Sequence, residues 1–218
     1  MKETYSHEGI TLINADCMDV MKGMRDKEFD LAIVDPPYGI GADTHAGSAN
    51  KGWTQWESTG WDKEKPNDEL ISAIVGAGRT AIVWGGNYFA DIFPASQGLL
   101  VWFKMQKDFS LADGELAWTS FDKPMRIYKV HWCGSAPKWE DTKGKIHPTQ
   151  KPVELYEWLI MKFSEQGQKI LDIHCGSGSS RIACHKEKMI FVGCEIDKEY
   201  FDKAIERFKN YKSQLKLF

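Results

Sequence analysis

Short apolar runs that end in turn residues alternate with helical stretches along this sequence, and no other feature constrains the fold as strongly. The expected strands cover residues 9–14, 29–34, 80–84, 99–103, 115–120, 126–130, 169–173 and 191–195, with 115–120 and 126–130 forming a hairpin. Apolar residues at helical spacing predict helices over 18–24, 68–77, 153–163 and 198–211, and another that follows the Gly-rich turn after residue 173 and ends near 186. This alternation is typical of α/β proteins with a mostly parallel sheet.

The length of 218 residues predicts a single domain, 1–218, with a substantial core. No apolar run reaches the ~18 residues of a membrane span, and the first residues lack an apolar signal core. We therefore expect a cytoplasmic protein. The net charge of -3 shows no overall excess of the basic residues that duplex-binding surfaces usually carry, although local basic patches remain compatible with it.

The five cysteines form no CxxC pair and suggest no disulfide framework. A zinc site would have to draw on His174, Cys175, Cys184, His185 and Cys194. Their spacing favours the simpler interpretation that they are small residues packed in the core, so we expect no metal.

Two segments, 39–66 and 104–145, are long, polar and turn-rich, which is typical of functional loops. Trp53, Trp56 and Trp61 lie close together in the first of them. Such a cluster is either a stacking surface or a small satellite core, and the sequence slightly favours the core.

Residues 171–180 (LDIHCGSGSS) run from an apolar strand into a Gly turn that opens a helix. Such a turn lets a ligand approach the backbone closely at the carboxyl edge of a parallel sheet. Glu195 follows the next strand, where an acid suits a ribose diol. The spacing is Gly-x-Gly-x-x-Arg, so the third glycine of a dinucleotide fingerprint is absent, which disfavours a dehydrogenase. A purely structural Gly turn is the alternative.

Asp35-Pro36-Pro37-Tyr38 (DPPY) follows the buried-type strand 29–34 directly. The two prolines fix φ and remove two N–H donors, so that the carbonyls there are rigidly aimed. A carboxylate beside such carbonyls can accept both hydrogens of an exocyclic amino group, and the tyrosine offers a face for stacking. A plain turn with a surface tyrosine is the alternative, which the position after a buried strand disfavours.

Taken together, these motifs resemble the circularly permuted β class of DNA amino-methyltransferases, which use S-adenosylmethionine (SAM). Other segments resemble that class in the same order: 14–17 (NADC), 61–62 (WD), 84–89 (WGGNYF), 115–118 (ELAW) and 147–152 (HPTQKP). The resemblance covers nearly the whole chain and is strongest to small phage or prophage-type members. It implies a Rossmann-like methyltransferase fold with a mostly parallel seven-stranded sheet that includes one antiparallel strand.

The resemblance also assigns site residues position by position. The catalytic set is Asp35, Pro36, Pro37 and Tyr38, and the cofactor set is Asp16, Cys17, Asp35, Thr149, Lys151, Asp172, His174, Gly176, Ser177, Gly178 and Glu195. His174 departs from the class, which often has phenylalanine there. A sizeable target-recognition insertion is also missing, which leaves 39–66 and 104–145 as candidate DNA-contacting segments.

The implied reaction is methylation of adenine N6 in DNA after base flipping, in a bacterial or phage-infected cell, as in restriction-modification. Several alternatives stay open: cytosine N4, which the aspartate at position 35 disfavours; RNA as substrate; and a non-catalytic subunit that only presents nucleic acid, which the intact acid and glycines disfavour. Relatives in the class are often dimers, so a homodimer is a further expectation.

Overall fold

A nine-stranded sheet forms the centre of the molecule, which is described here as a computed structural model covering residues 2–44, 56–105, 112–132 and 145–215. Its strands are β1 (Glu3–His7), β2 (Ile10–Asn14), β3 (Phe29–Val34), β4 (Gly78–Trp84), β5 (Leu100–Phe103), β6 (Gly114–Thr119), β7 (Arg126–Lys129), β8 (Lys169–Asp172) and β9 (Ile190–Glu195). They lie in the order β1-β2-β9-β8-β3-β4-β6-β5-β7. The prediction of an α/β fold with a mostly parallel sheet is confirmed.

The resemblance implied seven strands with one antiparallel strand, which is wrong: the sheet has nine strands, and both β1 and β6 run antiparallel to the parallel strands they pair with. The apolar runs predicted eight of the nine strands and missed β1. It is polar (ETYSH) and exposed or half-buried along its length, so it carries no apolar run. It pairs antiparallel with β2 at one edge of the sheet. An edge strand pairs with one neighbour and buries few side chains, so few of its positions must be apolar and its sequence pattern is weak.

The expected hairpin between residues 115–120 and 126–130 is also wrong. Both edges of β6 are already occupied, by β4 on one side and by β5 on the other, each antiparallel. The following strand β7 therefore passes β6 and pairs parallel with β5 at the far edge of the sheet. Two strands of the sheet, β6 and β7, thus come from segment 104–145.

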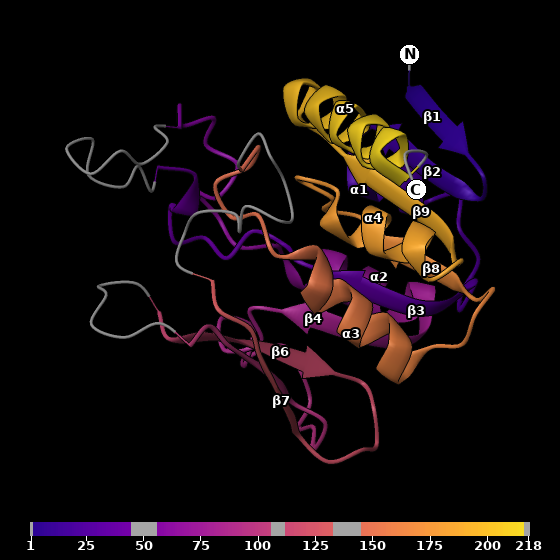
Figure 1. The fold of residues 1–218 in the computed structure, drawn as a ribbon. Helices are drawn as coiled ribbons and strands as arrows, with labels where there is room; N and C mark the ends of the chain where they lie inside the picture. The colour runs from indigo at the N-terminus through magenta and orange to yellow at the C-terminus, as the bar shows by residue number, and fades with distance from the viewer. Residues whose placement is uncertain (1, 45–55, 106–111, 133–144, 216–218) are drawn as a thin grey trace.

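Five helices and one 3₁₀ turn complete the described structure: α1 (Cys17–Met21), α2 (Asp68–Ala77), α3 (Val153–Phe163), α4 (Ser179–Lys186), α5 (Lys198–Leu215) and η1 (Ala42–Thr44). Figure 1 shows α3, α4 and α5 over one face of the sheet and α1 and α2 behind it. None of these helices is long and apolar enough to cross a bilayer.

Both faces of the sheet are buried, and the alternation along β3 shows how. Leu31 and Ile33 pack into the core beneath α3, α4 and α5, whereas Ala32 and Val34 pack into the core beneath α2. Side chains alternate between faces along a strand, so a strand covered on both sides reads as the continuous apolar run seen in the sequence.

Five contiguous strands, β2, β9, β8, β3 and β4, run parallel to one another. Their carboxyl ends therefore meet at one edge of the sheet, which is where ligands bind in open α/β sheets. The DPPY motif follows β3 and the Gly turn follows β8, and these two strands are direct neighbours. Motifs more than 130 residues apart in the chain are thereby brought side by side.

Candidate active site

Two cavities open at this edge of the sheet and share one wall. The first cavity has a volume of about 340 Å³ and the second about 570 Å³. The shared wall consists of Asp35, Trp61, Thr149, Gln150 and Lys151. A group held at Asp35 can therefore face a ligand in either cavity.

Both carboxylate oxygens of Asp35 accept hydrogen bonds within the site. The Tyr38 hydroxyl donates to Oδ1 at 2.6 Å, and Lys151 Nζ donates to Oδ2 at 2.5 Å. Lys151 is almost fully buried, and its Nζ also lies 5.4 Å from the ring centre of Trp84. The prolines at positions 36 and 37 leave no backbone N–H near this carboxylate from those two residues. In the part of the chain that the structure describes, the Asp35 carboxylate is thus held by the side chains of Tyr38 and Lys151.

The turn that follows Asp35 is held by Asp62, a buried residue. One of its oxygens accepts the backbone N–H groups of Tyr38 at 2.6 Å and Gly39 at 2.9 Å, and the other accepts that of Ala42 at 2.7 Å. Gly39 has φ of +73°, and a Cβ there would lie 2.7 Å from the backbone nitrogen of Lys65. Asp62 therefore fixes the path of the chain as it leaves the DPPY motif.

We expect Asp62→Asn to lower methyl transfer by about 10-fold or more, because an amide can accept at only one of its two positions and the turn after Asp35 would shift. Activity assays with circular dichroism as the fold check would measure this. Asp30→Asn is the matched control, since Asp30 lies at the opposite end of β3 and its carboxylate also accepts a backbone N–H, that of Lys169 at 2.9 Å. Equal activities of the two variants would refute the role of Asp62.

A row of alternating charges leads away from Asp35. Lys151 Nζ lies 2.9 Å from Glu115 Oε2, and Lys104 Nζ lies 2.7 Å from Glu115 Oε1. Burial acts to raise the pKa of Glu115, but Lys151 and Lys104 outweigh it and bring the pKa to about 2. For Asp35 the balance is reversed: burial raises its pKa, helped by Glu115 and opposed by Lys151.

Tyr38 is stacked on a second tyrosine. Its ring lies 4.9 Å from that of Tyr88 with an angle of 19° between the planes. On another side it rests against Gly85, where an added Cβ would come within 2.3 Å of the ring. Tyr88 is partly exposed and lines the second cavity together with Tyr38. One face of Tyr38 is therefore covered by an aromatic ring that borders the open cavity.

The Gly turn after β8 forms one wall of the first cavity through Gly176 and Ser177. Gly176 N donates to Glu195 Oε2 at 2.8 Å, which links the turn to the end of β9. Gly178 is outside the cavity wall, in the left-handed conformation that begins α4, and an added Cβ there would meet Ala204 and Arg181 instead.

Asp172 also points away from the first cavity. Its carboxylate accepts hydrogen bonds from His174 N at 3.0 Å and from the Ser180 hydroxyl at 2.6 Å, and these bonds stabilise the Gly turn. Burial raises its pKa to about 7, against these two hydrogen bonds. Among the residues assigned to the cofactor by resemblance, Asp172 and Gly178 thus act on the turn and do not line the cavity, whereas all the others line it.

The far end of the first cavity is lined by Asp16, Cys17, His174 and Glu195. Asp16 caps α1, where Oδ1 accepts Met18 N at 2.8 Å. Burial raises the pKa of Glu195 and, to about 11, that of Cys17. Burial lowers the pKa of His174 to about 4, so this imidazole is neutral at physiological pH.

His174→Phe should make the protein less sensitive to acid. The imidazole has a pKa near 6.5 when unfolded and about 4 when folded, so its contribution is full above pH 6.5 and is lost as the pH falls toward 4. Between pH 7.5 and pH 5.0 the wild type should lose about 2 kcal/mol more than the variant. Urea unfolding at both pH values measures this. Equal losses would show that His174 stays hydrated in the fold.

The first cavity fits SAM in size and chemistry. Its volume lies in the range of ~300–1,000 Å³ that is typical of small-molecule sites. The Glu195 carboxylate suits a pair of hydroxyls, and His174 Nδ1 is buried without a partner among the described residues, so a polar ligand atom would satisfy it. The contacts of individual residues with SAM stay predictions.

No group of three histidine, cysteine or acidic side chains suited to a metal occurs in the ranges that the structure describes. Cys175, Cys184 and Cys194 are buried, and each packs in one of the two hydrophobic cores. Trp61 lines both cavities, and Trp53 lies outside the described residues.

Several residues that line the cavities were not assigned to the site from the sequence, although three of them stand in segments noted there. Tyr156 and Tyr200 line the first cavity, Trp61 and Gln150 line both, and Glu115 lines the second. His147 belongs to the HPTQKP segment but was given no role. Its ring centre lies 5.4 Å from that of Trp61 and 4.3 Å from that of Tyr200, and burial lowers its pKa to about 3. A single acid in an otherwise apolar strand, such as Glu115 in GELAWT, was the clue available.

The sequence matches the model of a protein family described as DNA methylase, N6_N4_Mtase, over residues 78–206. Type II methyltransferase M.HpaI of Haemophilus parainfluenzae is 26% identical over 234 residues, covering 90% of this chain and 73% of the relative. Type II methyltransferase M2.DpnII of Streptococcus pneumoniae is 23% identical, covering 95% and 92%.

Two solved structures share the fold. The crystal structure of the M1.HpyAVI–SAM complex has a TM-score of 0.58 at 20% identity, covering 90% of this chain and 97% of that one. The PvuII DNA methyltransferase (cytosine-N4-specific) has a TM-score of 0.63 at 14% identity, covering 91% and 86%.

The fold is shared with methyltransferases of known structure, and the chain belongs to the DNA methylase family. This confirms the class that the sequence resemblance indicated, with SAM as cofactor and DNA as substrate.

Proposed function

We propose that this protein methylates the exocyclic N6 of adenine in DNA, with SAM in the first cavity and the target base in the second. The observation that carries the proposal is the position of Asp35 in the wall between the cavities. An aspartate begins the DPPY motif, which in the resembling class favours adenine.

The amino nitrogen of adenine is a weak nucleophile because its lone pair is delocalised into the ring. Asp35 and the Pro36 carbonyl would accept its hydrogens and draw the nitrogen toward tetrahedral geometry, which frees the lone pair to face the first cavity. SAM, when bound there, supplies the electrophilic methyl group. As the N–C bond forms, the bond between the methyl carbon and sulfur breaks and its electron pair stays on the sulfur, which becomes a neutral thioether. One excess proton is then left on the nitrogen, and Asp35 is placed to accept it. Positioning and fixed charges would supply most of the acceleration.

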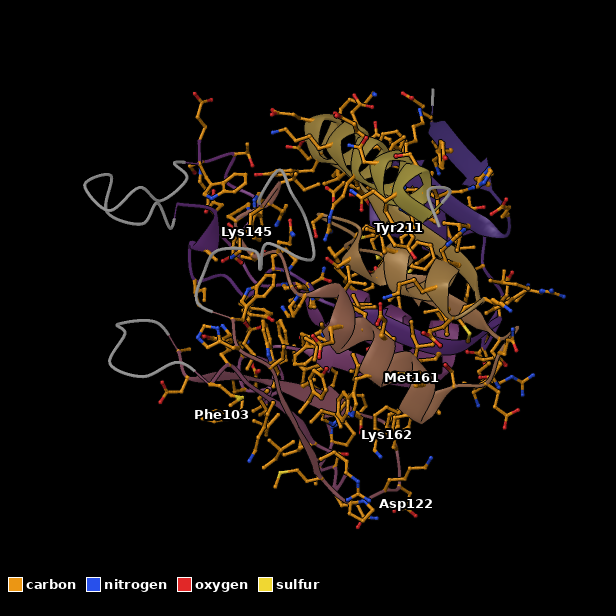
Figure 2. The ribbon with its side chains drawn as sticks, viewed as in Figure 1. Phe103, Asp122, Lys145, Met161, Lys162 and Tyr211 are labelled. Carbon is orange, nitrogen blue, oxygen red and sulfur yellow. The ribbon has the colours of Figure 1, made fainter. Side chains whose placement is uncertain are left out.

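A base within a duplex cannot reach a recessed carboxylate, so the target must be flipped out. Both Tyr38 and Tyr88 line the second cavity; the exposed Tyr88 offers a stacking surface there, whereas one face of Tyr38 is already covered by Tyr88. Its rim carries Lys145, which Figure 2 labels on the same side of the molecule as Phe103. Parts of both expected DNA-contacting segments, 39–66 and 104–145, line this cavity, which supports their assignment. A homodimer would enlarge the surface available to DNA.

Cytosine N4 is the second candidate. The acceptors at Asp35 suit any exocyclic amino group, and one structure that shares the fold is named as cytosine-N4-specific. A non-catalytic subunit is disfavoured because the complete DPPY turn and both cavities are present.

Labelled SAM, mixed with the protein and duplex DNA, tests the proposal when the product is digested to nucleosides. N6-methyladenine is the expected product. N4-methylcytosine would replace the proposal with the second candidate, and label on RNA alone would overturn both. If none of these substrates were labelled although SAM binds, the non-catalytic alternative would hold.

A further inference from the structure

The acid that the reaction uses does not stand alone in the site. Asp35 already accepts hydrogen bonds from Lys151 and Tyr38, at 2.5 and 2.6 Å. A target amino group that donates to Asp35 has to compete with an ammonium ion, which is a stronger donor than a neutral amine. A carboxylate has about four acceptor sites, so the amino group can join these donors, and its hydrogen bond to Asp35 strengthens when Lys151 loosens its hold.

A buried ammonium ion cannot leave one carboxylate without another to receive it. Only 4% of the Lys151 side chain is exposed, so an unpaired charge there would be costly. Glu115 Oε2 lies 2.9 Å from Lys151 Nζ, nearly as close as Asp35. A second acceptor is thus already in place beside the lysine.

Glu115 is itself fixed. It lies near the start of β6, opposite Trp102 of β5, and its other oxygen lies 2.7 Å from Nζ of Lys104, the residue that follows β5. The backbone N–H of Lys104 donates to Asp113 O at 2.8 Å. The four charged side chains alternate in sign as Lys104, Glu115, Lys151 and Asp35, and together they carry no net charge.

We propose that Glu115 is a positioning residue that takes over Lys151 when the target amino group binds Asp35. The inference rests on the proposed function, since it needs Asp35 to accept the amino hydrogens. Removing Glu115 leaves Lys151 with Asp35 as its remaining carboxylate partner in the row, so the ammonium holds Asp35 more tightly and the amino group binds it less well. Lys104 supports this role because it holds the other oxygen of Glu115 in place.

The charged and titratable groups around Asp35 give this role a pH signature. Asp35 faces Lys151 and Tyr38 directly and Glu115 beyond them, with Tyr156 of α3 and Asp172 of β8 also within electrostatic range. Burial raises the pKa of Asp35, and the negative charge of Glu115 raises it further. Loss of that charge must therefore lower the pKa of Asp35.

Glu115→Gln is the test, because it keeps the shape of the side chain and removes its charge. We expect kcat to fall about 10-fold or more while SAM affinity, measured by calorimetry, stays unchanged, since Glu115 is absent from the wall of the first cavity. In the pH profile of kcat/KM for DNA, which reports the free enzyme, the acid limb should move to lower pH. Glu154→Gln is the matched control: its carboxylate accepts the Tyr128 hydroxyl at 2.8 Å, outside the row.

A merely structural role would lower activity without moving the acid limb, and that result would overturn the proposal. If Glu115→Gln fails to fold, Lys104→Gln provides the test. It removes a cation that lowers the pKa of Glu115, so Glu115 becomes protonated, and can no longer take over Lys151, at a higher pH than in the wild type. The acid limb should therefore move to higher pH. An unmoved limb in that variant would overturn the proposal equally. If Asp35→Ala were itself fully active, the proposed function would fail; if Asp35→Ala were inactive and Glu115→Gln behaved as wild type, only this inference would fail.

Discussion

Asp35→Ala should abolish methyl transfer, with a loss of about 10²-fold or more, because the acceptor that positions the target amino group is gone. SAM binding should stay within a few-fold of wild type. The Lys151 ammonium keeps Glu115 at 2.9 Å, so no unpaired charge is left behind in the wall that the two cavities share. Single-turnover assays measure the first effect, and calorimetry with SAM measures the second.

Asp30→Ala is the control for this prediction. Asp30 lies on the same strand at its opposite end, where it accepts Lys169 N and pairs with Arg79. The Asp30→Ala variant should be less stable than the wild type but keep its turnover. Wild-type turnover in Asp35→Ala would contradict the mechanism, and equal losses in both variants would show that damage to β3 alone is enough to stop the reaction.

The part of the fold that the sequence predicted correctly is the part that local pattern determines. β3, β8 and β9 are buried on both faces, so each appears as an unbroken apolar run, and DPPY and the Gly turn mark the ends of the first two. The pairing of β7 depends on which strand edges remain open after β4, β5 and β6 have paired. The sequence of one segment does not indicate which strand edges are open, so a hairpin was the natural but wrong expectation.

The same limit applies within the site. Asp35 was found because the prolines and the strand beside it are neighbours in sequence. Asp62 contacts the DPPY motif from 24 residues further along the chain, and Glu115 contacts Lys151, which pairs with Asp35. Nothing next to Asp62 or Glu115 in the sequence indicates these partners. Gly178 differs from these residues: its place in the motif predicted a cofactor contact, which stays a prediction, but it lies outside the wall of the first cavity and has a positive φ of +72° at the start of α4.

Gly176 is therefore the glycine whose substitution should block SAM. It lines the first cavity with φ of +48°, a conformation that strains any β-branched residue. A Cβ there would lie 3.4 Å from the His147 ring, and the γ-methyl groups of valine would reach further. That ring cannot retreat easily, because Trp61 and Tyr200 pack against it. Overpacking of this kind costs about 1–3 kcal/mol.

Gly176→Val should therefore raise the Kd for SAM by about 10- to 100-fold and lower methyl transfer at limiting SAM accordingly. Gly167→Val separates this steric effect from backbone strain, since Gly167 also has a positive φ, +84°, but nothing lies within 4 Å of its added Cβ. Both variants should lose stability in urea unfolding, and only Gly176→Val should lose SAM. Equal SAM affinities in calorimetry would place the cofactor away from the Gly turn, because the turn would then tolerate a side chain where the ligand is expected to approach the backbone.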